Sequence, residues 1–138
     1  MSTIRQTIED RIRETVPDLR QVEGAAGLES IRNGKVSPPA AFVVEAANSV
    51  AQGIEGYQSV VESFAVVLVI HNRRDPQGGD ASDNCRLLRD QVAQALIGWQ
   101  PSMTYDPVAY VRGSLVSLSG ATLSWQEIYQ TIGVRRAG

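Results

Sequence analysis

The sequence has little of the residue types on which most catalytic and metal sites depend. It contains one histidine, His71, and one cysteine, Cys85. One cysteine cannot close an internal disulfide, which favours a reducing compartment. One histidine and one cysteine cannot supply the four ligands of a structural zinc site. The longest apolar run, 64–70, has seven residues, whereas a membrane-spanning helix needs about 20. We therefore expect no disulfide, no zinc site and no membrane span.

An excess of charge of one sign is also lacking. The 13 basic and 15 acidic residues leave a formal net charge of -2, so neither a nucleic-acid-binding patch nor a membrane-surface patch is predicted. The first residues, MSTIRQTIEDRIRE, are charged throughout and have no apolar core, so they do not form a signal peptide. We expect synthesis in a cytoplasm. With 138 residues, the chain 1–138 has the length of a single domain.

Two helices are predicted from apolar spacing and capping residues. The first has an apolar stripe at four-residue spacing, formed by Ile4, Ile8, Ile12 and Val16. Thr3 and Gln6 fit a capping box at its start. The second has a stripe formed by Ala81, Cys85, Leu88, Val92, Ala95 and Leu96. Asp80 or Ser82 is expected to cap this helix, and Gly98 is expected to follow its end.

Five segments are predicted to be strands: 19–22, 40–46, 60–72, 110–119 and 121–132. The segment 47–56 is small and polar, so we expect it to form the turn of a long hairpin. On the last strand, one face is formed by Leu123, Trp125, Glu127 and Tyr129. The order of helix, strands, helix and strands predicts an α+β fold. It has an antiparallel sheet of about four or five strands, with two main helices packed on one face.

The strand 60–72 is apolar on both faces. One face is formed by Phe64, Val66, Leu68 and Ile70, and the other by Ala65, Val67, Val69 and His71. A sheet with one wet face would alternate apolar and polar residues, so both faces should be covered. The two helices account for the first face, and we expect the second to lack a cover within this chain. A neighbouring subunit is the simplest cover, so we predict a homo-oligomer with subunit contacts at the second face.

Two loops are predicted to hold further contacts with subunits or partners, because loops on a rigid scaffold often form interaction surfaces. In the first, 47–56, the candidates are Gln52 and Glu55. In the second, which follows the apolar strand, they are Arg73, Arg74 and Asp75. A solvated loop is the plainer interpretation of these charges.

Chemical sites are weighed against plainer interpretations. A nucleophilic pair of Cys85 with His71 needs the intervening loop to fold back, and a buried cysteine with a strand-end histidine explains both residues. A hard cation could be held by Asp75, Asp80 and Asp83. Their spacing differs from that of a calcium loop, and a turn with helix capping explains the same residues. We predict no catalytic residue, no metal site and no cofactor.

Several short motifs together resemble a known family. They are PAAFV at 39–43, FAVVLVIHN at 64–72 followed by Arg74-Asp75, ALIGWQP at 95–101, and a closing strand with Trp125. Over about residues 4–132, this pattern resembles the small tail terminator (tail completion) proteins of long-tailed bacteriophages.

The resemblance implies an α+β structural protein of the virion with no enzymatic activity and no cofactor. It implies a ring, expected to be a hexamer, at the head-proximal end of the tail tube. That ring ends tube polymerisation and offers a docking surface to the neck or head. Its partners would be the tail tube protein, a head-tail connector protein and, in some tails, a sheath protein. Neither a membrane nor specific nucleic-acid binding is implied, although the genome passes through such a ring at the tail-neck junction.

Two other functions remain open at this point. One is another neck, tail-completion or baseplate component. The other is a small ligand-binding or enzymatic domain, which would be monomeric or dimeric and have a deep pocket around His71. A measurement of the oligomeric state would discriminate best between these functions.

Overall fold

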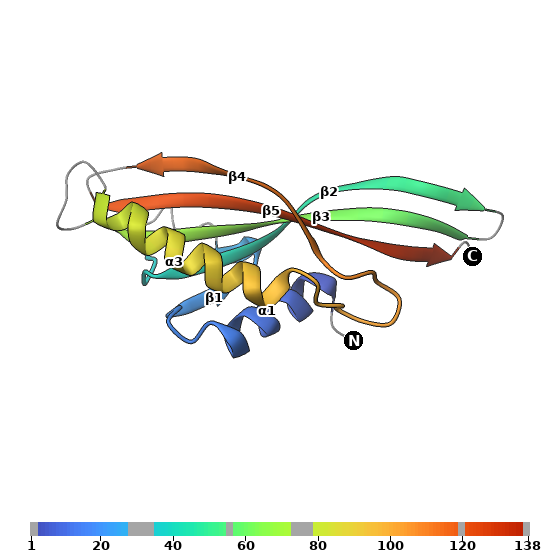
Figure 1. Ribbon diagram of the computed structural model, residues 1–138, viewed down its shortest axis with the longest axis horizontal. Helices are drawn as coiled ribbons and strands as arrows, with labels where there is room; N and C mark the ends of the chain where they lie inside the picture. The colour runs from blue at the N-terminus through green and yellow to red at the C-terminus, as the bar shows by residue number, and fades with distance from the viewer. Residues whose placement is uncertain (1–2, 28–34, 55–56, 73–78, 119–120, 137–138) are drawn as a thin grey trace.

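The computed structural model describes residues 3–27, 35–54, 57–72, 79–118 and 121–136 (Figure 1). The helices are α1 (Ile4–Thr15), the short 3-10 helix η1 (Ala25–Gly27) and α3 (Gly79–Leu96). The strands are β1 (Gln21–Glu23), β2 (Ala40–Ile54), β3 (Tyr57–His71), β4 (Ala109–Leu118) and β5 (Thr122–Arg136). No described helix is both long and apolar enough to cross a membrane.

The five strands form one sheet in the order β1-β2-β3-β5-β4. The short β1 is parallel to β2, and the other neighbouring strands are antiparallel. Both α1 and α3 lie on one face of the sheet (Figure 1). On the side where the chain's C-terminus lies, β2, β3 and β5 extend beyond the two helices (Figure 1). The predicted α+β class, with about five strands and two main helices on one face, is confirmed. The sheet was predicted to be antiparallel, and the parallel pairing of β1 with β2 is the exception.

Local capping chemistry sets the helix ends. The Thr3 hydroxyl accepts a hydrogen bond from the Gln6 amide at 3.1 Å, and the Gln6 side chain accepts one from the Thr3 amide at 3.0 Å. This is the predicted capping box. Gly98 has a φ of +80°, the left-handed conformation that commonly follows a helix end. The predicted cap of the second helix is wrong, because α3 begins at Gly79 and includes both Asp80 and Ser82.

The long hairpin differs from its prediction. The segment 47–56 was expected to form the turn, but β2 continues to Ile54, and its pairing with β3 extends to Tyr57. Register shifts between Glu45 and Ala47, and between Val50 and Gln52, accommodate extra residues in β2. Pairing with β3, which is rich in β-branched residues, keeps the small and polar residues of β2 extended. The composition of 47–54 alone therefore does not decide its structure. Gln52 therefore lies in a strand, opposite Ser59, while residues 55–56 lie outside the described ranges.

The main core lies between the helices and one face of the sheet. From β3 it includes Phe64, Val66, Leu68 and Ile70, as the alternation predicted. From the two helices it includes Ile8, Ile12, Ala81, Cys85, Leu88, Val92, Ala95 and Leu96. Both predicted helical stripes therefore face this core.

Part of the second face of β3, at Ala65 and Val69, is covered within the chain, contrary to the prediction that this face lacks a cover. Val69 is 1% exposed and Ala65 is 6% exposed. Val69 belongs to a small second core with Phe42, against which Val36 packs. A Cβ atom added to Gly27 would lie only 2.7 Å from Cε1 of Phe42. The connection between β1 and β2 therefore contributes the missing cover, which the sequence did not reveal because this connection has no periodic apolar pattern.

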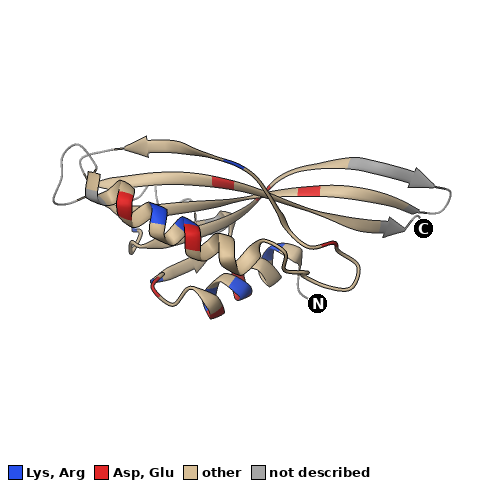
Figure 2. Ribbon diagram, in the orientation of Figure 1, with Lys and Arg blue, Asp and Glu red and all other residues tan. Residues whose placement is uncertain are grey.

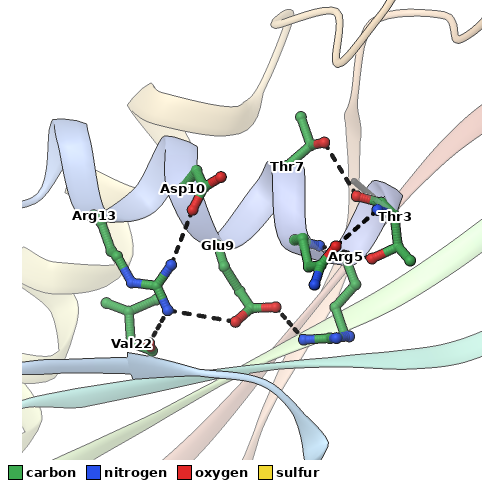
Figure 3. Close-up of polar contacts among 8 residues, drawn as sticks. Thr3, Arg5, Thr7, Glu9, Asp10, Arg13 and Val22 are labelled. Atoms are coloured by element: carbon green, nitrogen blue, oxygen red, sulfur yellow. Dashed lines mark hydrogen bonds and ion pairs between the residues drawn. The ribbon is translucent and has the colours of Figure 1, made fainter. Parts of the chain in front are cut away.

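A buried carboxylate fixes α1 to β1. Glu9 is 5% exposed and pairs with two arginines of its own helix, Arg5 and Arg13 (Figure 3). The distance from Arg13 Nη2 to Glu9 Oε1 is 3.5 Å, and the same nitrogen donates to the Val22 carbonyl of β1 at 2.6 Å. Glu9 thus holds the guanidinium group that joins helix and sheet.

Replacing Glu9 with glutamine should lower the free energy of unfolding by about 1–2 kcal/mol, because both arginines lose their charged acceptor in a partly buried site. Urea unfolding followed by circular dichroism measures the change. The matched control is Asp10→Asn, since the Asp10 side chain is 60% exposed and pairs with Arg13. That control should cost less than about 0.5 kcal/mol. Equal losses in the two variants would contradict a special role for Glu9.

Candidate functional site

The outer strand β4 is the most exposed strand of the sheet. Only Gly113 of its ten residues is even partly buried. Its exposed apolar side chains are Tyr110, Val111, Leu115, Val116 and Leu118, between 41% and 55% exposed. Tyr110 packs against Tyr129, and Leu115 and Leu118 line a hollow beside α3. Several large, half-exposed apolar side chains on one strand are typical of an interaction site.

The free edge of β4 lacks the usual protection against pairing with another strand. Among the described residues, β4 pairs as a strand only with β5. It contains no proline and no lysine, and Arg112 is its one charged residue. Figure 2 shows that charge gathers on α1 and α3 and is sparse on the strands. Exposed edges in monomeric proteins commonly have charges or prolines, so this edge is suited to receiving a partner.

A buried polar cluster lies between α3 and the first half of β4. Glu127 of β5 is 2% exposed and forms an ion pair with Arg89 of α3. The Trp125 indole Nε1 donates to Glu127 Oε1 at 2.6 Å, and the Arg89 guanidinium lies 4.1 Å from the Trp125 ring centroid. Burial, and then the hydrogen bond to Glu127, raises the pKa of Tyr110 of β4. The cluster links α3, β5 and β4.

Gly113 allows β4 to approach this cluster. A Cβ atom there would lie 2.7 Å from the Tyr110 hydroxyl and 2.8 Å from Glu127 Oε1. Beyond the cluster, a hollow of about 240 Å³ separates α3 from β4. It is lined by Ser82, Asp83, Cys85, Arg86, Arg89, Leu115, Leu118, Leu123 and Trp125. The site as a whole is thus the apolar edge strand β4, held in place by the polar cluster around Glu127.

Comparison with known proteins identifies the family to which this chain belongs. Residues 3–137 match the family model described as phage tail terminator protein. The chain belongs to the phage tail terminator family. It is therefore a structural component of a phage-type virion tail, and the resemblance found in its motifs is confirmed. A comparison with curated proteins finds no match.

A solved structure supports the fold of this terminator-family chain. A chain in the structure titled "Virion of native gene transfer agent (GTA) particle" superposes with a TM-score of 0.55 at 13% sequence identity. The match covers 96% of the present chain and 92% of the other. At this identity the likeness establishes a shared fold, and the family assignment stands on the family model.

The two residues weighed as a nucleophilic pair line different hollows. His71 lines a hollow of about 300 Å³ together with Asp18, Pro39, Ile70, Asn84, Leu87, Leu88 and Gln91. Cys85 lines the other hollow, beside Arg89 and Trp125. Among the described ranges, no three His, Cys, Asp or Glu side chains gather into a group that could hold a metal ion. Asp75 lies outside those ranges.

The predicted contact residues have different outcomes. Ala65 and Val69 are buried in the single chain, so little of their surface remains for a subunit contact. Val67 and His71 are half-buried. The side chain of Gln52 is not described, and Glu55, Arg73, Arg74 and Asp75 lie outside the described residues.

Sequence analysis missed both β4 and the polar cluster as a site. One available signal was Glu127. This acidic residue lies on the same strand face as Leu123, Trp125 and Tyr129, and that face packs against the core. A carboxylate in such a position needs a buried partner. Its partner Arg89 is 38 residues away in the chain, so only the fold brings the two together.

Cys85 should be unreactive in the folded protein. Burial raises its pKa to about 11, although nearby Arg89 acts in the opposite direction. At pH 8 we expect no reaction with Ellman's reagent until urea unfolds the chain, when one thiol should react. The unfolded thiol ionises near pH 8.5, so stability should fall as pH rises from about 8.5 to about 11. Rapid labelling of the native protein at pH 8 would contradict this assignment.

Proposed function

We propose that this protein forms a closed ring at the head-proximal end of a phage tail tube. The ring ends tube polymerisation and provides the surface on which the neck or head docks. The single observation that supports this most is the exposed apolar edge of β4 in a chain of the tail terminator family. The family match over 3–137 also supports treating residues 1–138 as one domain.

The proposed ring is a hexamer of identical subunits. A ring requires a head-to-tail contact between two different patches of each subunit, and it closes when the rotation between copies completes a circle. Its neighbours are the tail tube protein on one side and a head-tail connector protein on the other, with a sheath protein as a further partner in a contractile tail. The protein acts without catalysis, cofactor, membrane or specific nucleic-acid contact, and the genome passes through the ring.

Further contacts are proposed at the residues that the sequence singled out. Val67 is half-buried on the face of the sheet away from the helices, and His71 is half-buried beside a hollow that residues of α3 also line. Gln52 and Glu55 belong to or follow the far end of β2, and Arg73, Arg74 and Asp75 follow β3. We propose contacts with the tube or the neck at these positions, because each one belongs to or directly follows the end of a long strand in the sequence.

The proposal is tested by removing the gene for this protein from its phage and examining the tails by electron microscopy. Tails without the ring should have a broad length distribution and no attached heads, and supplying the protein should restore one length. Native mass spectrometry of the purified protein and of dissociated tails should find a six-subunit species. Tails of normal length in the deletion would overturn the terminator function. A defect confined to the host-proximal end would favour a baseplate role.

A further inference from the structure

We propose that the ring is closed by strand pairing between copies, with the outer edge of β4 in one copy joined antiparallel to the outer edge of β2 in the next. The sheets of all copies then form one continuous belt. This inference rests on the proposed ring and specifies the contact that builds it. The occupant of the β4 edge is thus a second copy of this chain.

The first observation is the chemistry of the β4 edge. The outward amide and carbonyl groups of an edge strand need an extended partner, and another strand satisfies them best. Its neighbouring side chains are apolar and exposed, with Leu115 at 52% and Val116 at 55%. A second strand pairing here would satisfy the backbone and remove apolar surface from water together.

The second observation is that the same chain offers another open edge. β1 pairs with β2 only at Ala40, Ala41 and Phe42. Among the described residues, no strand pairs with the outer side of β2 beyond Phe42. The exposed residues that follow are small or polar, including Ala46, Ala47 and Ser49, and small side chains allow a second sheet to approach closely.

Strand direction fits this head-to-tail pairing. Successive strands in the order β2-β3-β5-β4 are antiparallel, so β4 runs opposite to β2. A rotation about the ring axis preserves the sense of each strand relative to that axis. The β2 of the next copy therefore runs antiparallel to β4, and the alternation continues across the contact. Such a contact joins two different edges, as a closed ring requires.

Strand levels indicate a stagger between copies. Gly113 of β4 is level with Val43 of β2 through the paired residues Glu127 and Val66. The free part of β2 therefore begins opposite the first half of β4. A shift of about five residues, roughly 17 Å, would bring all of β4 against free β2 edge. Tilted strands in closed barrels have this kind of stagger.

Ring closure favours β4–β2 pairing over symmetric β4–β4 pairing. A two-fold β4–β4 contact would leave both β2 edges open and stop at a dimer, whereas a β4–β2 contact leaves one free edge of each kind for the next copy. The strand charges do not decide between the two contacts. Arg112 pairs with Ile128 on the face away from the helices, whereas Glu45 pairs with Phe64 on the face towards them.

The test is disulfide trapping with pairs of engineered cysteines. Ser114 is opposite Gln126 and level with Val67, and Ala47 is opposite Ser63, so both lie on the face away from the helices and both are exposed. We would make Ser114→Cys with Ala47→Cys, and Ser114→Cys with Ser49→Cys. The proposed stagger of about five residues places Ser114 opposite Ala47, and Ser49 is the next residue of β2 on the same face. Native Cys85 is 2% exposed and stays unreactive.

Under mild oxidation, at least one double variant should give a disulfide ladder that ends at the ring size. A mixture of the two corresponding single variants should give dimers alone, since each chain then has one engineered thiol. The matched control is Ser114→Cys with Glu14→Cys, because Glu14 is exposed on α1, and this pair should give no ladder.

Two results would overturn the interface. One is efficient dimer formation by Ser114→Cys alone, which indicates β4–β4 pairing. The other is no ladder from either double variant while electron microscopy still finds rings, which leaves the proposed function intact and removes this contact. A protein that forms no rings and leaves tail length unchanged overturns the proposed function itself, and the interface with it.

Discussion

Replacing Glu127 with alanine should lower the free energy of unfolding by about 3 kcal/mol. Removing one member of a buried ion pair leaves the other charge without compensation, which typically costs about 3–5 kcal/mol. We expect the lower end because the Arg89 side chain is 28% exposed and can reach water. The Trp125 indole also loses its acceptor. Urea unfolding followed by tryptophan fluorescence measures both the stability and the environment of that indole.

The control for Glu127 is a neighbouring charge in solvent. Asp90 is exposed on α3, next to Arg89, and Asp90→Asn should change stability by less than about 0.5 kcal/mol. Glu127→Gln should fall between the two, because an amide oxygen can still accept from Trp125 but no longer neutralises Arg89. A loss below about 1 kcal/mol in Glu127→Ala would show that the cluster is solvated and does not support β4.

Replacing Phe42 with alanine should cost about 3 kcal/mol in the single chain. Phe42 is 0% exposed and lies in the second core, on the face of the sheet away from the helices. If that face were covered only by a neighbouring subunit, the variant would disturb assembly and leave the monomer as stable as before. The measurement is urea unfolding at a protein concentration at which light scattering finds monomers.

Val67→Ala is the matched control for Phe42. Val67 packs against the same second core but is half-buried, so losing two methyl groups there should cost about 1 kcal/mol. Equal and small losses in both variants would mean that the connection between β1 and β2 does not cover this face in solution. The prediction thus decides between the covered face of the structure and the open face inferred from the sequence.

The parts of the fold that the sequence predicted are those set by local chemistry. The capping box at Thr3 and Gln6, and the left-handed Gly98 after α3, depend on residues within one helical turn of each other. The strand β3 was also predicted correctly, because its segment is rich in β-branched residues, which favour an extended backbone. Long-range pairing could not be read in this way. The extension of β2 to Ile54 follows from its partner β3, and the parallel β1 follows from a tertiary contact.

The candidate site was beyond sequence analysis for a related reason. The segment Ala109–Leu118 has the apolar and β-branched residues of an interior strand, and its sequence does not say that it lies at the edge. Only the strand order places it there. The covering of Val69 depends in the same way on a connection without any regular pattern. Edge position and loop packing are properties of the whole topology.

The strand order also has a consequence for the timing of synthesis. Of the described strands, β5 is synthesised last, yet it lies inside the sheet between β3 and β4. In the described part of the chain, β4 reaches the sheet only through β5. A nascent chain that still lacks its C-terminal strand therefore has no attached β4 edge to present. The β4 edge that we propose for joining copies would therefore be in place only once β5 has been synthesised, so chains that lack β5 would not pair through it.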